Sequence, residues 1–325
     1  MPELPEVEHV KRGIAPGVEG TTIQEVQFSE QVKLGKNNQR ETIIKGLELD
    51  TFKTFTEGYT INQIERRSKY IYFHLQQGDE TRIMVSHLGM TGGYFVVNDL
   101  DDIGNHNYRK HWHVIFHLDN NKMLVYADIR RFGEIRNIPE LAAYPPLLEI
   151  APEPFRDEAL QHYLSYFNER KFLKKPIKAM ILDHRVIAGC GNIYACEALF
   201  RAGIHPARKA NSLTMQERKL LFYYIREVLE EGIRYGGTSI SDYVHSDGRH
   251  GEMQNRLNVY KQDTCKVCGT PIERQVIATR NSHFCPQVEL RQANLPFQNY
   301  YQLTVSRLWM LISLQDKQSR KVLMA

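Results

Sequence analysis

The first half of the chain alternates apolar and polar residues, and the second half repeats apolar residues at helical spacing. Between positions 20 and 135, segments with a period of two predict half-buried β-strands, among them Tyr70–Leu75, Ile83–Val85, His113–Leu118 and Met123–Tyr126. Turn-forming residues separate these segments, as at Gln77-Gly78-Asp79 and Asp119-Asn120-Asn121. Strands joined by short turns pair in antiparallel fashion, so the pattern predicts an antiparallel sandwich or barrel.

A short helix is predicted ahead of these strands, over residues 4–14. Val7, Val10 and Ile14 repeat at helical spacing and form an apolar face. Pro5 suits the first turn of a helix, where the N–H group that proline lacks has no partner within the helix. Burial of the apolar face would hold the residues in front of the helix rigidly.

A run of prolines over residues 138–155 indicates a connection between two parts of the chain. Beyond it, Thr214-x-x-Glu217 is the pattern of a capping box at the start of a helix, and Gly236-Gly237 is predicted to end that helix. One face of the predicted helix is apolar and consists of Leu220, Leu221, Tyr224, Ile225, Val228 and Leu229. Residues 256–287 are predicted to form a small hairpin held together by a metal.

Composition narrows the class of protein. A chain of 325 residues can bury a large core and accommodate two domains. Its net charge of +4 permits nucleic-acid binding without requiring it. No apolar run approaches the ~20 residues of a membrane span, and the N-terminus lacks a signal-peptide pattern. Five cysteines, an odd number, indicate a reduced cytosolic protein; Cys190 and Cys196 are predicted to be buried packing residues.

The N-terminal sequence MPELPEVE carries candidate chemistry. If Met1 is removed, Pro2 presents a secondary amine, which can attack a sugar or carbonyl carbon and form an iminium. An α-amino group has a pKa of roughly 8, so part of it is unprotonated at neutral pH. Glu3 follows directly and can supply a proton.

Seven sequence blocks, taken together and in order, resemble the formamidopyrimidine-DNA glycosylase family, which removes oxidised purines and nicks the DNA. They are MPELPEVE, RRSKY (66–70), SHLGMTGG (86–93), YADIRRFG (126–133), AGCGNIYACEALFRAGIHP (188–206), GGTSISDY (236–243) and CKVCG (265–269). The resemblance implies a bifunctional enzyme, in which Pro2 attacks C1′ of the damaged nucleotide and Glu3 transfers protons. Elimination of the 3′ and then the 5′ phosphate follows. Glu6 is interpreted as structural.

The resemblance also implies how DNA is held. Lys69 and His87 correspond to phosphate contacts. Arg280 corresponds to a phosphate-binding arginine of the family's zinc finger, which is the predicted hairpin of residues 256–287. The residues implied to fill the gap left by an extruded nucleotide are Met90, Arg130 and Phe132, with Arg130 bonding the orphaned cytosine. Asn192, at the start of an apolar run, is predicted to cap a helix whose free N–H groups attract a phosphate.

A zinc ion is the one cofactor that the resemblance implies, with ligands at Cys265, Cys268 and Cys285. The family pattern has a second C-x-x-C, but here position 288 is Val288. A structural zinc ion takes four ligands. Water, His283 or Glu289 remain as candidates for the fourth, and a finger without metal remains an alternative.

The expected fold is α+β. Residues 1–140 form a β-sandwich or barrel domain that carries the catalytic residues, and residues 141–255 form a helical helix–two-turns–helix domain with a lesion loop at 236–254. A zinc-ribbon-like hairpin at 256–288 and an atypical tail at 289–325 follow. The tail is interpreted as the product of a frameshift or as a natural extension.

The expected substrate is damaged double-stranded DNA, with 8-oxoguanine opposite cytosine and ring-opened purines as the lesions. We expect a monomer in the bacterial cytoplasm, associated with the nucleoid and not with a membrane. Two alternatives remain open at this stage. One is an endonuclease VIII-like enzyme that prefers oxidised pyrimidines, and the other is a non-catalytic DNA-binding protein in which Met1 is retained or the finger is unfolded.

Overall fold

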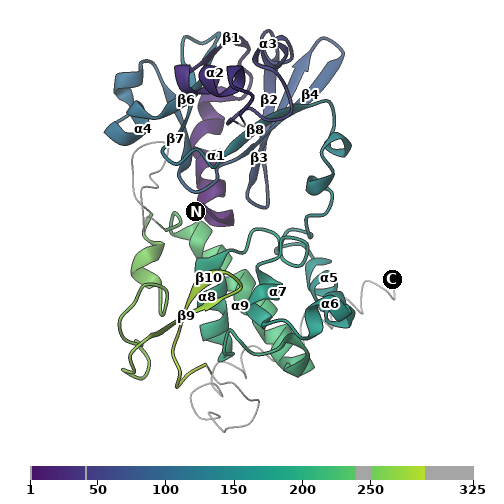
Figure 1. Ribbon diagram of the computed structural model, residues 1–325, viewed down its shortest axis with the longest axis vertical. Coiled ribbons are helices and arrows are strands. Elements are labelled where there is room, and N and C mark those ends of the chain that lie inside the picture. Colours follow the sequence, from purple (N-terminus) through teal and green to yellow (C-terminus); the bar gives the residue numbers. More distant parts are fainter. Residues whose placement is uncertain (1, 41, 239–250, 290–325) are drawn as a thin grey trace, which may run out of the picture. The chain divides into compact units, whose positions relative to one another are not determined.

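Two four-stranded antiparallel sheets form the first half of the protein (Figure 1). The computed structural model describes residues 2–40, 42–238 and 251–289. In spatial order, one sheet contains β1 (Ile23–Phe28), β6 (Trp112–Leu118), β7 (Met123–Asp128) and β5 (Gly92–Val97). The other contains β2 (Thr60–Arg67), β3 (Tyr70–Gln77), β4 (Glu80–His87) and β8 (Glu134–Ile138). The expected α+β class with an antiparallel N-terminal region is confirmed.

All four predicted strand segments lie inside observed strands, namely β3, β4, β6 and β7. The predicted turn at Gly78 is also present. Gln77 pairs with Glu80, so Gly78 and Asp79 form a two-residue loop. Gly78 has a φ of 57°, a left-handed conformation that glycine adopts without steric cost.

Helix α1 (Leu4–Val18) packs its apolar face against both sheets. Val7, Val10 and Ile14 are almost completely buried, as the helical spacing predicts. The helix continues four residues past its predicted end, because Val18 extends the buried stripe by one more turn. Three short helices connect the strands of this half: α2 (Glu30–Asn37), α3 (Leu49–Thr54) and α4 (His106–Lys110).

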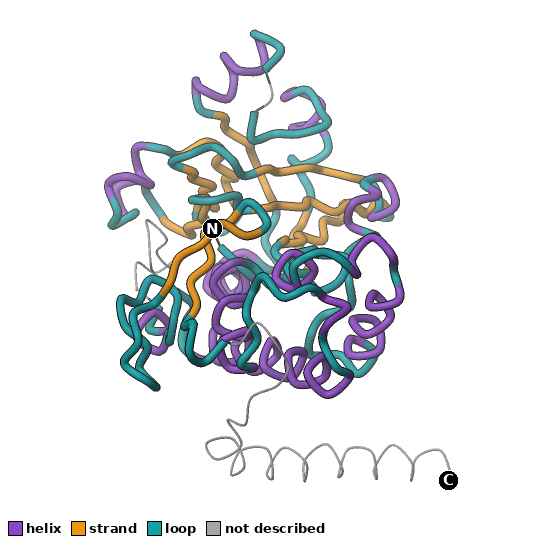
Figure 2. Tube along the Cα trace, turned by 60° about the horizontal axis from the view of Figure 1, so that its bottom comes forward, coloured by secondary structure: helices purple, strands orange, loops and turns teal. Residues whose placement is uncertain are grey.

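The second half is helical and surrounds its own hydrophobic core (Figure 2). Its helices are α5 (Ala159–Ser165), α6 (Arg170–Leu173), α7 (Ile177–Ile181), α8 (Asn192–Ala202) and α9 (Met215–Arg234). Helix α9 packs closely on α8 and α1. Gly232 permits this approach, because a Cβ there would lie 2.5 Å from the Tyr194 hydroxyl and 2.7 Å from Pro5 Cγ.

The predicted capping box of α9 is present. The Thr214 side chain accepts a hydrogen bond from the Glu217 backbone N–H, and the Glu217 carboxylate accepts one from the Thr214 N–H. After Arg234 the chain turns through Gly236 and Gly237, both with positive φ, as predicted for the end of this helix. Leu221, Ile225 and Leu229, which belong to the predicted apolar face, are buried.

A hairpin of β9 (Glu273–Ile277) and β10 (Arg280–Phe284) follows near the end of the described chain. Its two-residue loop, Ala278 and Thr279, has positive φ at both positions, the conformation of a tight hairpin turn. Within the described residues, no helix is long and apolar enough to cross a membrane.

Replacing Thr214 with alanine should lower the free energy of unfolding by about 1 kcal/mol, because the cap of α9 loses one hydrogen bond. Urea denaturation followed by circular dichroism measures the change. Thr214→Ser keeps the hydroxyl and is the matched control. Equal stability of the two variants would contradict a contribution from the cap.

Candidate functional site

The buried carboxylate of Glu3 joins the N-terminus of the chain to the start of α8. Glu3 is 1% exposed. Its Oε2 accepts a hydrogen bond from the Gly191 N–H at 2.7 Å, and its Oε1 accepts one from the Ile193 N–H at 2.9 Å. The first N–H groups of a helix lack partners within the helix and carry partial positive charge. A carboxylate from a segment 188 residues away therefore caps α8.

Asn192 does not cap α8 with its side chain, so this part of the sequence interpretation was wrong. The N-cap residue is Gly191, and Asn192 is the first residue of the helix. N–H groups that were predicted to attract a phosphate instead bond Glu3. The sequence could not reveal this, because the cap comes from a distant part of the chain.

Two glycines make room for this contact. A Cβ at Gly191 would lie 2.3 Å from Glu3 Cδ, and a Cβ at Gly189 would lie 2.4 Å from Leu4 Cβ. Gly189 also has a φ of 76°, which disfavours any other residue. The glycines of the segment AGCGN are thus explained by the close approach of the N-terminus.

Glu6 orders the segment that carries Pro2 and Glu3. Its carboxylate accepts hydrogen bonds from the backbone N–H of Glu3 at 2.9 Å, from the Tyr194 hydroxyl at 2.8 Å and from the Thr238 N–H at 2.7 Å. These contacts agree with the structural role predicted for Glu6. Pro2, which precedes this bonded pair of glutamates, is buried.

The surroundings of Glu3 only partly offset the cost of burying its charge. Burial raises the pKa of Glu3, and the positive charge of Lys69 and the Ile193 N–H oppose that effect. Lys69 is half-buried and follows Ser68, whose left-handed φ of 56° turns the chain between β2 and β3. The charge of Lys69 is therefore close enough to Glu3 to affect its pKa, as we expect of two residues that act in one site.

A partly buried ion-pair network holds the turn that carries Lys69. Arg66 contacts Glu8 of α1 at 2.9 Å and Glu153 at 2.7 Å. Glu153 also contacts Arg67 at 3.0 Å and accepts a hydrogen bond from the Ser68 N–H at 2.6 Å. Glu153 belongs to the proline-rich connection, so this network ties α1, the Lys69 turn and the connection together.

His87, at the end of β4, lies in the same electrostatic environment. Burial and the positive charge of Lys69 lower the pKa of His87 to about 4, so the ring is neutral at neutral pH. Its Nδ1 accepts a hydrogen bond from the Gly89 N–H at 3.1 Å, and its ring lies 5.0 Å from that of Tyr70. A neutral imidazole with Nδ1 occupied can donate a hydrogen bond through Nε2.

Asp128, which is completely buried, joins the two loops that carry the predicted void-filling residues. It accepts hydrogen bonds from the Thr91 hydroxyl at 2.6 Å and from the Gly133 N–H at 2.8 Å. The Arg130 N–H in turn donates to the Thr91 hydroxyl at 2.9 Å. The loop after Met90 and the loop from Arg130 to Gly133 are therefore held side by side.

The side chains on these loops are available to a ligand. Phe132 is 59% exposed, although a phenylalanine normally avoids water. The Arg130 guanidinium carbon lies 4.8 Å from the centre of the Phe132 ring. Met90 is half-buried on the neighbouring loop. The structure thus brings Arg130 and Phe132 into contact and holds the Met90 loop beside them.

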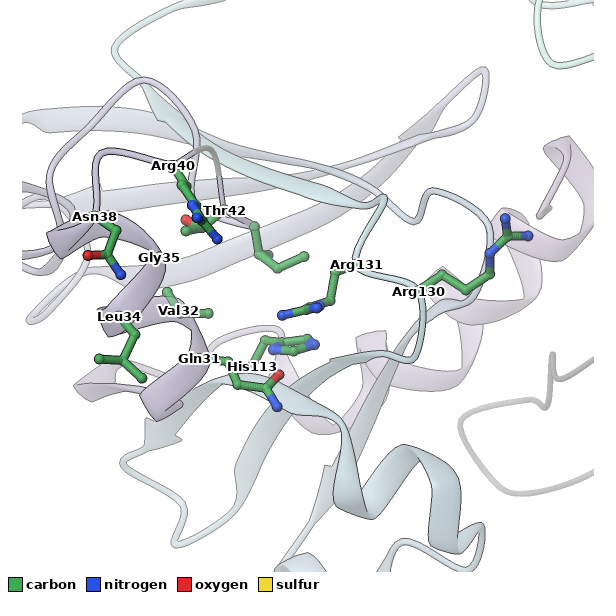
Figure 3. Close-up of a pocket in the computed structure, with 11 residues that line it drawn as sticks. Gln31, Val32, Leu34, Gly35, Asn38, Arg40, Thr42, His113, Arg130 and Arg131 are labelled. Carbon is green, nitrogen blue, oxygen red and sulfur yellow. The ribbon is translucent and has the colours of Figure 1, made fainter.

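A pocket of about 490 Å³ lies on the other side of the Arg130 loop, against α2. Figure 3 shows the Arg131 side chain pointing into it near His113, whereas the Arg130 side chain points away. Arg131 has a φ of 57°, and this left-handed residue reverses the direction of the side chains. Pro2, Glu3 and Lys69 do not line this pocket, so it is separate from the candidate catalytic residues.

The start of α8 is tied to the hairpin that carries Arg280. Asn192 Nδ2 donates to the carbonyl oxygen of Asn281 at 2.9 Å. The fully buried Lys178 of α7 donates to Asn192 Oδ1 at 2.6 Å and to the Ser282 hydroxyl at 2.5 Å. Arg280, the first residue of β10, is exposed beside this junction. These hydrogen bonds therefore fix the position of Asn192 relative to the strand that begins with Arg280.

Three cysteines form the only cluster of metal-binding type found among the described residues. The sulfur atoms of Cys265, Cys268 and Cys285 lie within 4.8 Å of one another. Three converging thiols fit a zinc ion, which favours sulfur ligands. Cys190 and Cys196 are buried as predicted, and burial raises the pKa of both thiols. Some predicted features, namely Met1, most of the lesion loop and the tail beyond Glu289, lie outside the described residues.

Sequence reasoning missed three residues that organise the site: Asp128, Glu153 and Lys178. Asp128 and Lys178 are buried and Glu153 is half-buried, and each of these charged side chains bonds partners far away in the sequence. Asp128 stands inside the block YADIRRFG, so its presence there was the available signal. Glu153 and Lys178 had no comparable signal, because both lie outside the quoted blocks.

Three family models match the chain in consecutive segments. The formamidopyrimidine-DNA glycosylase N-terminal domain matches residues 1–135, and the H2TH domain of the same enzymes matches residues 150–244. A zinc finger found in FPG and IleRS matches residues 263–287. The formamidopyrimidine-DNA glycosylase of Bacillus licheniformis is 40% identical over 292 residues, which are 88% of this chain and 98% of that protein.

Solved structures show the same fold. MutM (Fpg) of Thermus thermophilus superimposes with a TM-score of 0.73 at 35% identity, covering 89% of this chain and 98% of that one. The Lactococcus lactis Fpg bound to DNA with an abasic site has a TM-score of 0.74 at 31% identity, covering 89% and 100%. MutM bound to DNA that contains carbocyclic 8-oxo-G has a TM-score of 0.75 at 33% identity, covering 89% and 99%.

Replacing Glu3 with glutamine tests the buried carboxylate through the pH dependence of stability. Because the folded pKa of Glu3 is raised, the folded state binds this proton more tightly than the unfolded chain does. The resulting stabilisation is complete below the unfolded pKa of about 4.3 and is lost as the pH rises through the folded pKa. We expect the unfolding free energy of the wild type, relative to Glu3→Gln, to fall as the pH rises from about 4 to 7.

Urea denaturation at a series of pH values measures this difference. Glu25→Gln, at an exposed position of β1, is the matched control for the change of side chain. A wild-type advantage that stays constant or grows with pH would show that the folded pKa of Glu3 is not raised.

Proposed function

Because the chain belongs to the formamidopyrimidine-DNA glycosylase family, we propose that it removes oxidised purines from double-stranded DNA and then cleaves the strand. The lesions are 8-oxoguanine opposite cytosine and formamidopyrimidines. The observation that carries the proposal is the position of Glu3. Its buried carboxylate lies directly after Pro2, caps α8 and lies within electrostatic range of Lys69.

The reaction begins when the Pro2 nitrogen attacks C1′ of the damaged nucleotide. The bond from C1′ to the base breaks, and the base leaves with the bonding electrons and a proton. Glu3 protonates the ribose ring oxygen, the ring opens, and an iminium links Pro2 to C1′. The raised pKa of Glu3 supports this role, because it keeps the carboxyl group protonated to a higher pH than usual.

The iminium makes the protons at C2′ acidic. Loss of one proton eliminates the 3′ phosphate, and a second elimination releases the 5′ phosphate. Water then hydrolyses the remaining bond and regenerates the Pro2 amine. The DNA is left with a gap where the damaged nucleotide was.

Four groups are proposed to hold the DNA backbone: Lys69, His87, Asn192 and Arg280. Lys69 acts as a point charge beside the reactive nucleotide. Asn192 and Arg280 act as a pair, and their support is the bond between Asn192 and Asn281 together with the Lys178 bridge. A zinc ion at Cys265, Cys268 and Cys285 would order the finger that presents Arg280.

Met90, Arg130 and Phe132 are proposed to fill the gap that the extruded nucleotide leaves. Extrusion costs a few kcal/mol, and an inserted side chain offsets part of this cost. The exposed Phe132 ring supports a wedge role, and the adjacent guanidinium of Arg130 can bond the orphaned cytosine. The Asp128 contacts keep both loops in place for insertion.

We further propose the domain boundaries 1–140, 141–255 and 256–288, with the catalytic residues in the first domain. The enzyme acts as a monomer on chromosomal DNA in the cytoplasm. The same assignment predicts that an oxidised-purine duplex is cleaved faster than an oxidised-pyrimidine duplex.

Replacing Pro2 with glycine should reduce covalent trapping to background, because the secondary amine that forms the iminium is lost. The assay incubates the full chain with an 8-oxoguanine:cytosine duplex and borohydride, and then separates the protein–DNA adduct by electrophoresis. DNA binding should stay close to the wild-type level, which a mobility-shift titration checks. Trapping of Pro2→Gly at the wild-type rate would remove Pro2 from the mechanism.

Replacing Lys69 with alanine should weaken DNA binding and lower the slope of log K against log salt by about 0.9, which corresponds to one phosphate contact. Fluorescence anisotropy at several salt concentrations measures the slope. Lys219→Ala, at an exposed position of α9, is the matched control and should leave the slope unchanged. A slope for Lys69→Ala equal to that of the control would mean that Lys69 does not contact a phosphate.

A further inference from the structure

The finger contains two turns of the same construction, and only one of them ends in a second cysteine. In the first turn the Gly269 N–H donates to the Cys265 carbonyl at 2.9 Å. In the second turn the Glu289 N–H donates to the Cys285 carbonyl, also at 2.9 Å. Val288 therefore occupies in the second turn the position that Cys268 occupies in the first.

The second turn keeps the features of a metal-binding turn despite this change. The backbone N–H groups of Gln287 and Val288 are directed at the Cys285 sulfur. The sulfur atoms of Cys268 and Cys285 are 3.4 Å apart, close to the ~3.8 Å that tetrahedral Zn–S bonds of ~2.3 Å imply. Three ligand positions are thus formed, and a valine stands at the fourth.

Neither candidate side chain near the cluster completes it. Among the described residues, the metal-type cluster contains the three cysteines and no carboxylate or imidazole. Glu289 Oε2 accepts a hydrogen bond from the Cys285 N–H at 2.7 Å, whereas Oε1 is buried without a hydrogen-bond partner among the described residues and lies outside the thiol cluster. The His283 ring packs edge-to-face against Tyr260, with 4.7 Å between ring centres.

Solvent can reach the cluster from one side. Cys265 and Cys285 are buried at 2% and 0% exposure, but Cys268 is exposed and Val288 is only half-buried. Three thiolates and one Zn²⁺ carry a net charge of −1, and a neutral donor at the remaining position leaves that charge unchanged. A zinc site with three protein ligands and an accessible fourth position binds water or another small molecule.

We propose that the finger binds zinc through Cys265, Cys268 and Cys285 and leaves the fourth position to an exchangeable neutral ligand. Water fills this position in buffer, and a nitrogen donor such as imidazole replaces it. The side chain at 288 decides whether the position is open. This property is independent of the glycosylase reaction, because none of the proposed catalytic groups takes part.

Cobalt substitution tests the proposal by spectroscopy. The full chain is loaded with Co²⁺ in the presence of a phosphine reductant, which keeps the thiols reduced, and imidazole is then titrated while the visible d–d bands are recorded. We expect a saturable shift of the bands in the wild type. Val288→Cys supplies a fourth thiolate and should give a spectrum that imidazole does not change.

The Glu289→Gln variant tests the remaining possibility, which is that the Glu289 carboxylate moves onto the metal. We expect it to respond to imidazole as the wild type does. A response of Glu289→Gln with none in the wild type would overturn the proposal, because Glu289 would then be the fourth ligand. Failure of the wild type to bind Co²⁺ when Val288→Cys binds it would also overturn it.

Zinc release gives a second readout that requires no activity assay. Transfer of zinc to a colorimetric chelator should be at least about tenfold faster for the wild type than for Val288→Cys, because one protein ligand is missing. If Val288→Cys does not fold, the imidazole titration of the wild type still decides the proposal. A wild-type spectrum that does not change with imidazole overturns it.

Discussion

The carboxylate of Glu3, buried against the first N–H groups of α8, is the contact on which the arrangement of the site depends. A buried charge is costly unless it is fully hydrogen-bonded. Here the backbone of α8 supplies the bonds, and the helix dipole favours a negative charge at that position. The same contact fixes Glu3, and with it Pro2, relative to the helical half of the chain. Gly191 is necessary because any Cβ would occupy the place of the carboxylate.

Other charged side chains, buried or half-buried, hold the rest of the site in a similar way. Glu153 holds the Lys69 turn, Asp128 holds the two loops that carry Met90 and Phe132, and Lys178 joins α8 to the hairpin. Asp128 and Lys178 each bond groups from two segments, and Glu153 bonds three consecutive residues, Arg66 to Ser68. Loss of one partner would leave an uncompensated polar group in the interior, which costs more than the bond itself contributes. These residues therefore position the groups proposed to touch DNA without touching it themselves.

The finger differs in how it is held. Strand β9 buries one residue, Ile277, whereas β10 buries Ser282, His283 and Phe284. Ile277 and Phe284 are the only buried apolar residues of the two strands, so this small unit depends on its metal and on the junction with α8. A cluster of three thiols keeps the geometry of a zinc site, while Val288 removes one anchor. The bonds from Lys178 and Asn192 to the hairpin provide a second support that does not involve metal.

The sequence by itself determined the local elements and the chemistry of single segments. Alternation predicted the strands, the Thr214 capping box predicted the start of α9, and ordered motif blocks identified the family. These signals are local, because each depends on residues within a few positions of one another. Tertiary structure alone decided the cap of α8, where Asn192 looked like the capping residue and Glu3 took that role. It also decided what Asp128, Glu153 and Lys178 do. The partners of these charged side chains are distant in the sequence, and only folding brings them together.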